Sequence, residues 1–487
     1  MRVPVVVAIA VSAVSSLARA DDTLTLPQVL AAAVRQSPDL ERASIDLKTA
    51  EAALLRAKGI EDTHLGATGQ IDRFSITADD VTAVTTEGNG SVSLTKTLPT
   101  GTVVGVSLGT FYNSQPEASV TPVNGAFLTT SNYLTAGTFT LTQPLLRGAW
   151  SGFDAPIRDA EHGRDAAKLA REAKARDLIV QIAEAYWQVS LARESLDVRK
   201  ASLDLAKQQL ATTEAQIRID KVARSEALAV KQVIATRQQD VISAEQQIYD
   251  RSLALRELAG LEIGPDALAV KTETLGAIGD DTLDLKSTVA AAFEHSAQLA
   301  SLAEGVKAAE ANIDTAQSAA RPRLDVSVGG GPAGTDTSFA KSIQSVVRSD
   351  GYELTANVTF DATIERHAEK GGLADAHARL QRTRVDERAA RAHIATQAIR
   401  IVQRVKAAYA SAKLSDEAIQ LANQNIDAEK KRFELGKSTN FDVLRRQDEL
   451  EQANLRKVSA IVDYLSARAE LDALTGAILS KYAITLR

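Results

Sequence analysis

The chain has 487 residues, of which 45% are hydrophobic and 24% are charged, so it is expected to fold rather than to remain disordered. Aromatic residues make up only 4%, which favours helices rich in Ala, Leu and Val over several conventional globular cores. The formal net charge of -6 disfavours nucleic acid as a partner. Cysteine is absent and the single methionine is Met1, which excludes disulfides, thiolate metal sites and cysteine nucleophiles, and no metal or cofactor is expected.

The first twenty residues have the pattern of a secretory signal peptide. Arg2 precedes an apolar run over 3–14, and the sequence ARA at 18–20 matches a small-x-small cleavage site, so we expect cleavage before Asp21. A short membrane anchor is the alternative, but the run is well below the roughly 18 residues needed to span a bilayer. No later segment has that many consecutive apolar residues, so a mature chain that crosses a bilayer is expected to do so with strands.

The sequence contains two similar halves. The segments KTAEAAL and LTLPQVLAAA of the first half align, at one common shift, with KAAEANI and LDLKSTVAAA of the second half. The ends also align, ALRELAGL with AELDALTGA, but at a smaller shift, so the first half carries about forty extra residues. The sequence therefore predicts a first structural repeat over 21–260, a linker over 261–282 and a second repeat over 283–487.

Each repeat shows the same order of patterns, namely a helix, a strand-rich stretch, a very long helix, a turn and a shorter helix. The expected helices are 26–58, 156–218 and 224–259 in the first repeat, and 285–317, 369–434 and 440–475 in the second. At a rise of 1.5 Å per residue, each long helix reaches roughly 95 to 100 Å, and the two shorter helices of a repeat together reach about the same length. Equal spans allow the helices to pack side by side as staves.

Strand-rich stretches are expected at about 64–142 and 323–361. The clearest alternation occupies 352–361, where the apolar residues of one face include Tyr352, Leu354, Val358 and Phe360. A strand of this length with one apolar and one polar face is typical of a transmembrane β-barrel, in which the apolar face contacts lipid. A soluble sheet with one hydrated face has the same period and remains the alternative.

The positions of two further segments, a predicted hairpin and a run of glycines, are less well defined by the sequence. SVSLTKTL at 91–98 and TVVGVSLGTFY at 102–112, joined by PTG, predict a hairpin that lies either in the barrel wall or outside it. The triple glycine at 329–331 is expected in an extracellular loop.

No catalytic motif stands out, and the chain is not expected to be an enzyme. Gly436-Lys437-Ser438 resembles the end of a phosphate-binding loop, but Lys431 occupies the position of the required first glycine and the segment follows a helix rather than a strand. The few histidines do not support a metal site or a Ser-His-Asp arrangement.

The two turn segments carry a family resemblance. FELGKSTNFDVL at 433–444 and IRIDKVARSEAL at 217–228, together with LTQPLLRG at 141–148 and AYWQVSLARESL at 185–196, occur in an order that resembles the TolC-like outer-membrane efflux family. The resemblance implies an α+β membrane protein, in which a long periplasmic α-helical barrel continues a transmembrane β-barrel formed by a homotrimer. Each protomer is then expected to give four strands to a twelve-stranded barrel, and the linker is expected in an equatorial belt.

The resemblance also implies function and partners. It implies a passive outer-membrane exit channel for the substrates of an inner-membrane transporter, reached through a periplasmic adaptor protein, in efflux or type I secretion. The expected partners are two further copies of the chain, the adaptor, the transporter and outer-membrane lipid, with no cofactor.

Site residues follow from the resemblance at the two turns. The adaptor-docking tip is expected to include Gly436, Lys437, Ser438, Asp220 and Lys221. The expected periplasmic gate comprises Asp442, Arg445, Glu226, Ser225, Arg224 and Phe433. Asp442 matches a ring aspartate of the family, whereas Arg445 and Phe433 replace a second aspartate and a tyrosine, so we expect Arg445 to pair with Glu226, or Arg224 with Asp442. Asp442 also fits a helix cap that begins at Thr439.

Two other functions remain open. A soluble periplasmic coiled-coil scaffold would explain the helices but not the alternation over 352–361. An independent uptake porin would not need roughly 100 Å of periplasmic helix. The sequence does not identify the exported substrate.

Overall fold

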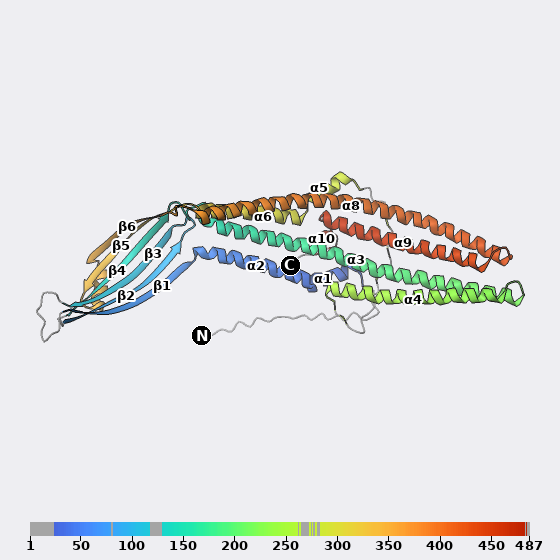
Figure 1. The fold of residues 1–487 in the computed structure, drawn as a ribbon, viewed down its shortest axis with the longest axis horizontal. Helices are drawn as coiled ribbons and strands as arrows, with labels where there is room; N and C mark the ends of the chain where they lie inside the picture. Colours follow the sequence, from blue (N-terminus) through green and yellow to red (C-terminus); the bar gives the residue numbers. More distant parts are fainter. Residues whose placement is uncertain are drawn as a thin grey trace, which may run out of the picture. The chain divides into compact units, whose positions relative to one another are not determined.

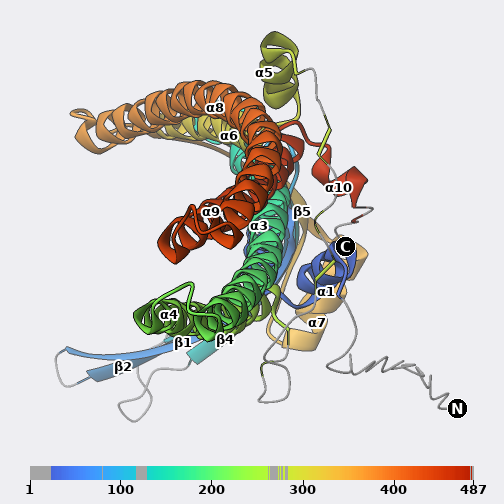
Figure 2. The same cartoon turned by 90° about the vertical axis from the view of Figure 1, so that its right-hand side faces the viewer.

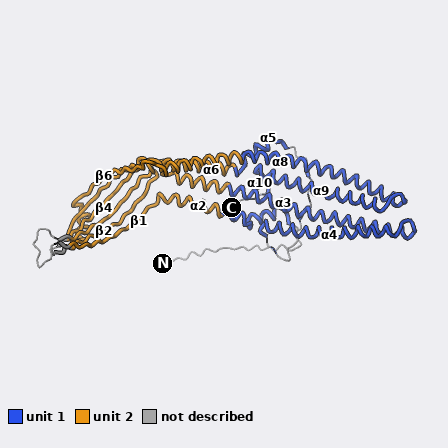
Figure 3. The backbone as a smooth tube through the Cα atoms, in the orientation of Figure 1, with its two compact units in different colours: residues 1–44, 170–298, 390–487 blue, residues 45–169, 299–389 orange. Residues whose placement is uncertain are grey.

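The computed structural model describes residues 24–78, 81–116, 129–261, 263, 272–273, 275, 278–279, 283–482 and 484. The expected signal peptide and most of the expected linker lie outside these residues. The chain divides into two compact units, each of which draws on both halves of the sequence (Figure 3). Unit 1 comprises the described residues of 1–44, 170–298 and 390–487, and unit 2 those of 45–169 and 299–389.

Unit 1 is helical. Its helices are α1 (Leu26–Gln36), the start of α2 (Pro38–Lys58), most of α3 (Ser151–Arg218), α4 (Arg224–Ala259), α5 (Leu285–Glu294), most of α8 (His367–Glu434), α9 (Asn440–Leu474) and α10 (Ile478–Lys481). The two long helices, α3 and α8, have 68 residues each and confirm the sequence prediction. Figures 1 and 2 show α4 beside α3 and α9 beside α8, and ion pairs such as Lys231–Glu214 and Lys457–Asp416 join each pair of helices.

The expected single helices at 26–58 and 285–317 are wrong, because each is divided in two. Ser37, with ψ 125°, separates α1 from α2, since Pro38 has no N–H and disfavours a helical residue before it. In the second half, α5 ends before His295 and α6 (Ala297–Ala319) follows. Gly260 and Gly476, both with positive φ, lie against these breaks.

Those two glycines have little space for a side chain. A Cβ on Gly260 would lie 2.6 Å from the carbonyl oxygen of Gln36, and one on Gly476 would lie 2.8 Å from the Cβ of His295. Both residues adopt the left-handed conformation that commonly follows a helix C-terminus. The ends of α4 and α9 therefore pack closely against the two helix breaks.

The main core of unit 1 forms where α1, α3 and α4 meet. It includes Leu30, Ile179, Tyr186 and Leu255, all without measurable exposure. The Tyr186 hydroxyl donates to the carbonyl oxygen of Leu24 at 2.9 Å and accepts from the backbone N–H of Glu273 at 3.0 Å, so this buried polar group is satisfied. Burial raises the pKa of Tyr186. The motif AYWQVS thus supplies a core residue that also anchors two extended segments.

Unit 2 is built on one antiparallel sheet. Its strands are β1 (Thr63–Ala78), β2 (Val81–Thr97), β3 (Val103–Pro116), β4 (Thr129–Pro144), β5 (Arg323–Asp336) and β6 (Gly351–Asp361), paired in that order (Figure 1). The sheet of the described residues thus has six strands, two more than the four that the family resemblance predicts for the barrel wall. The hairpin left open in the sequence is β2–β3, and it lies within the sheet between β1 and β4.

Glycines allow close approaches in this sheet. Gly101, with φ 82°, turns the chain between β2 and β3, and a Cβ there would lie 2.2 Å from the carbonyl oxygen of Gly148. The expectation that 329–331 forms a loop is wrong, because these residues belong to β5. A Cβ on Gly331 would lie 1.8 Å from the carbonyl oxygen of Gly137, so the strand needs glycine at this point.

The two faces of the sheet differ in polarity. Residues paired across an antiparallel ladder carry their side chains on the same face, so a row of partners defines one face. One row crosses all six strands as Leu65, Leu94, Val106, Phe139, Gly330 and Leu354. The row beside it, on the opposite face, consists of His64, Thr95, Gly105, Thr140, Gly329 and Thr355. The sheet therefore has an apolar face and a polar face along its full width.

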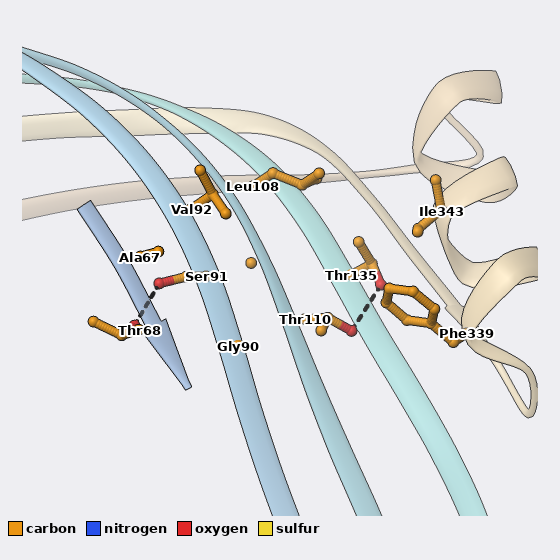
Figure 4. A pocket seen from close by; sticks show the side chains of 11 residues that line it. Ala67, Thr68, Gly90, Ser91, Val92, Leu108, Thr110, Thr135, Phe339 and Ile343 are labelled. Carbon is orange, nitrogen blue, oxygen red and sulfur yellow. Dashed lines mark hydrogen bonds between the residues drawn. The ribbon is translucent and has the colours of Figure 1, made fainter. Parts of the chain in front are cut away.

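A short helix that the sequence analysis did not anticipate, α7 (Phe339–Arg348), packs on the apolar face. Its Ser342 hydroxyl lies 2.8 Å from the hydroxyl of Thr135, and the Phe339 ring lies 5.9 Å from the ring of Tyr133. Residues of β1–β4 and of α7 line an open cavity of about 290 Å³. Figure 4 shows two of these residues, Phe339 and Ile343. None of the helices in the described ranges combines the length and apolar character needed to cross a membrane.

Candidate functional site

The candidate site lies in unit 1, at the turns that join α3 to α4 and α8 to α9. Both turns have the same backbone pattern. In the first, Asp220 has φ 57° and the N–H of Lys221 donates to the carbonyl oxygen of Gln216 at 3.0 Å. In the second, Gly436 has φ 71° and the N–H of Lys437 donates to the carbonyl oxygen of Arg432 at 2.8 Å. This is the Schellman motif, which ends a helix with one left-handed residue.

The turns expose apolar side chains. Ile219 is 62% exposed, and Leu435 and Phe441 are each 72% exposed. A Cβ built on Gly436 meets no atom within 4 Å, so the position beside these side chains is open. The expected docking residues Gly436, Lys437, Ser438, Asp220 and Lys221 thus share these two turns with exposed apolar groups.

Asp442 caps helix α9. Its Oδ2 accepts from the backbone N–H of Thr439 at 3.3 Å, and its own backbone N–H donates to the Thr439 hydroxyl oxygen at 3.3 Å, which is a capping box. The Thr439 hydroxyl also donates to Oδ2 at 2.7 Å. Hydrogen bonds from the Thr439 side chain and backbone, followed by one from Ser438, lower the pKa of Asp442. The capping role is thus observed, and a pore-facing role stays a prediction.

The other expected gate residues have different partners from those proposed. Arg445 pairs with Glu449 at 3.5 Å rather than with Glu226, which accepts from the side-chain amide of Asn440 at 3.1 Å. Phe433 is buried, with 3% exposure. Arg224 and Ser225 are exposed in the first turn of α4. The expected charge pairs therefore do not form within the described chain, and pairs between copies stay a prediction.

The structure instead shows a hydrogen-bonded cluster around Asn440, at the start of α9. The Asn440 carboxamide oxygen accepts from Gln209 at 2.8 Å and from Thr213 at 2.7 Å, both on α3, while its amide donates to Glu226 on α4. Asn440 is 1% exposed. We name Gln209, Thr213, Glu226 and Asn440 the Asn440 cluster. It joins α9 to both helices of the other hairpin.

A second cluster lies two turns further along α9. Arg237 on α4 donates to the carbonyl oxygen of Ser202 at 2.6 Å, to Gln447 at 3.1 Å and to Asp448 at 2.6 Å. The Arg237 side chain is 5% exposed, whereas that of Asp448 is 57% exposed. We name these four residues the Arg237 cluster. Because a buried guanidinium needs polar partners, this cluster sets how α4 and α9 pack against α3.

Sequence reasoning missed both clusters, although a signal for them was present. On α4, Val230, Arg237 and Ala244 are buried and lie seven residues apart, so a charged residue occupies a heptad position of the packed stripe. Asn440 and Gln447 on α9 repeat this spacing. Polar residues at such positions specify the register of packed helices at some expense of stability.

A pair of carboxyl groups in the same unit, Glu184 on α3 and Glu470 on α9, lies away from the two turns. Burial, a hydrogen bond with Glu470 and the charge of Glu470 raise the pKa of Glu184 to about 7, although the guanidinium of Arg404 lowers it. Arg404 itself donates to Glu470 at 2.5 Å. Near neutral pH, therefore, the Glu184 carboxyl on α3 is protonated in part of the molecules. Elsewhere in the described segments, no group of three or more His, Asp or Glu is arranged to hold a metal ion.

This pair predicts a pH-dependent stability. Because the folded-state pKa of Glu184 exceeds its ordinary value of 4.5, its contribution to stability is present below pH 4.5 and is lost as the pH rises through about 7. We expect the melting temperature of the wild type to fall from pH 5 to pH 8, and Glu184→Gln to reduce that fall. Thermal unfolding at several pH values measures it, with Asp197→Asn, an exposed carboxylate on α3, as control. An identical pH profile for Glu184→Gln and the wild type would contradict the assignment.

Comparison with known proteins identifies the family. The model of the outer membrane efflux protein family matches residues 104–261 and 289–477. The CmeC outer membrane channel of Campylobacter jejuni superposes with a TM-score of 0.68 at 12% identity, over 93% of this chain and 86% of that chain. VceC of Vibrio cholerae superposes with a TM-score of 0.67 at 18% identity, over 95% of this chain and 97% of that chain. The open-state MtrE channel of Neisseria gonorrhoeae superposes with a TM-score of 0.64 at 15% identity, over 93% of this chain and 89% of that chain. No curated protein matches the sequence.

The chain therefore belongs to the outer membrane efflux protein family. It is a channel of the outer membrane with helices that extend into the periplasm, and its family transports substrates and is not a family of enzymes. This confirms the TolC-like resemblance and the expected location.

Proposed function

We propose that this chain is the passive exit duct of a tripartite export system. In this proposal three copies form one channel, an inner-membrane transporter supplies the energy, and a periplasmic adaptor protein connects the two. The sheet of unit 2 forms the membrane part, with its apolar face toward lipid, and the helices of unit 1 form the periplasmic tunnel.

The observation that carries this proposal is the pair of matching turns at the ends of the long helical hairpins. A turn exposed to the periplasm normally carries polar residues, whereas these turns expose Ile219, Leu435 and Phe441. Exposed apolar groups rimmed by charged ones, here Lys221 and Lys437, mark a surface for another protein. An adaptor hairpin is the partner that an export channel needs at its periplasmic end.

Gly436 provides the sharpest test of docking. We expect Gly436→Trp to reduce export at least tenfold while oligomers form normally, because a Cβ at this position meets no atom of its own chain within 4 Å and the indole beyond it would occupy the docking surface. Gly436→Asn is the matched control, since asparagine tolerates the left-handed conformation and adds little bulk. If both variants export equally well, Gly436 only terminates its helix.

Contact with the adaptor is measured separately by photo-cross-linking in the source bacterium. A photoreactive phenylalanine analogue at Leu435 should capture the periplasmic adaptor, and Gly436→Trp should abolish that product. The same analogue at Leu421, which is 53% exposed on α8, is the control. Equal capture at both positions, or none at Leu435, would contradict docking through the turns.

The Asn440 and Arg237 clusters support a role for this end of unit 1 as the gate. Both are polar contacts between hairpins rather than apolar packing, so water can replace them when the hairpins separate. A closed state held by such groups favours one register of the packed helices, and the difference in free energy between the closed and open states stays small. The scaffold alternative offers no reason for the apolar face of the sheet.

A further inference from the structure

We propose that β1 of one copy pairs with β6 of the next, so that three copies close an eighteen-stranded membrane wall rather than the twelve-stranded one expected from the family resemblance. This inference rests on the proposed three-copy channel. It adds the interface between copies and the number of strands in the wall.

The edges of the sheet require a partner. Within the described residues, β1 pairs only with β2, and β6 pairs only with β5, so each has one side without a strand. These strands have 16 and 11 residues. In the hydrocarbon part of a membrane no water is available to satisfy the backbone groups along such an edge, and each unsatisfied group costs several kcal/mol. Both edges must therefore be covered in the outer membrane.

One chain does not close on itself. Six strands are fewer than the eight of the smallest bacterial barrels, and β1 and β6 lie at opposite ends of the strand order. The number of strands is even and all neighbours are antiparallel, so β6 of one copy runs antiparallel to β1 of the next. A second copy thus continues the same type of ladder.

The faces also continue across such a junction. The apolar row ends in Leu65 at the β1 edge and in Leu354 at the β6 edge, which are 75% and 74% exposed. Joining the edges of two copies with their apolar faces on one side makes a single lipid-facing surface. Helix α7 packs mainly against β4 and β5 rather than against the edge strands β1 and β6.

The strand number follows from the β2–β3 hairpin. Leu94 and Val106 of this hairpin lie in the same row as Leu65 and Phe139, with continuous pairing on both sides. Three copies of six strands give eighteen, a size at which barrels enclose an aqueous channel. The lumen is correspondingly wider than that of a twelve-stranded wall, since barrel diameter grows roughly linearly with strand number.

Disulfide trapping tests the interface, and the absence of native cysteine makes it free of background. Single cysteines at Leu65, Ala67, Gly69 or Ile71 are combined with single cysteines at Leu354, Ala356, Val358 or Phe360, all on the apolar face. We expect covalent trimers only for combinations that fit one antiparallel register, in which moving the cysteine toward the end of β1 requires moving its partner toward the start of β6. Absence of intermolecular products in every combination would overturn the interface.

Spin labels test the strand number. In the membrane, labels at Leu94 and Val106, which are direct partners, should collide with lipid-soluble oxygen, and labels at the partners Ser93 and Ser107 should collide with a water-soluble nickel complex. If all four positions are accessible only to the nickel complex, the hairpin lies outside the wall and the eighteen-strand count is wrong.

The outcomes separate this inference from the proposed function. Disulfide-trapped trimers, together with spin labels that alternate between lipid and water accessibility, support both the strand count and the three-copy channel. Trapped trimers with four water-accessible labels contradict the strand count and leave the export channel standing. Wild-type protein that is monomeric in the outer membrane would contradict the three-copy channel itself.

Discussion

Replacing Asn440 with alanine should open the periplasmic end of the channel. The substitution leaves the side-chain amide of Gln209 without its acceptor and Glu226 without its donor, in a site where Asn440 is 1% exposed. An unsatisfied buried donor costs about 1 to 3 kcal/mol, and each 1.4 kcal/mol changes an equilibrium about tenfold. We therefore expect the open population to rise by about fivefold to a hundredfold, measured as single-channel open probability in planar bilayers.

A matched control separates this effect from general damage. Asn425→Ala changes the same residue type at an exposed position of α8 and should leave the recordings unchanged, because exposed substitutions alter stability by less than about 0.5 kcal/mol. Wild-type open probability in Asn440→Ala would show that the Asn440 cluster does not hold the channel closed.

Loss of Arg237 should destabilise the helical unit more than any other single truncation at the tip. Arg237→Ala removes three hydrogen bonds and leaves the side-chain oxygen of Gln447 without its donor, although the Gln447 amide still donates to the carbonyl oxygen of Leu205. Breaking a fully buried ion pair costs about 3 to 5 kcal/mol, but water still solvates Asp448, which is 57% exposed, so we expect about 2 to 3 kcal/mol. Chemical denaturation of the purified protein followed by circular dichroism measures this change.

Two variants delimit the interpretation. Arg251→Ala truncates an exposed arginine of the same helix and should change stability little. Arg237→Met retains the packed volume without the charge, and we expect it to recover most of the stability while still opening the tip, because methionine does not specify the helix register. An Arg237→Ala variant as stable as Arg251→Ala would contradict a structural role for the cluster.

The helices and strands were largely predictable, because their signals are local. The long helices α3 and α8 follow from apolar periodicity over many turns, and the alternation over 352–361 corresponds to β6. The breaks in the first helices were harder to predict, since the one at His295 contains no proline and depends on packing against Gly476. The placement of β2–β3 depends on pairing with β1 and β4, which no local pattern specifies.

The site was less predictable than the fold. The turns at Asp220 and Gly436 were located correctly because left-handed helix ends have a local signature. The partners of Arg445 and Glu226 were not predicted correctly, because charge alone allows many pairings on neighbouring helices. The buried positions of Arg237 and Asn440 become visible only when their heptad spacing is compared with the apolar residues around them. We therefore expect gating at this tip to depend on polar residues in a packed seam rather than on exposed charges.

Single-channel recording of the purified wild-type protein tests most directly whether the chain forms a passive outer-membrane exit channel. We expect discrete conductance steps in planar bilayers, driven by voltage or a salt gradient without any nucleotide. Bilayers that contain the inserted protein yet remain without conductance steps would contradict this expectation.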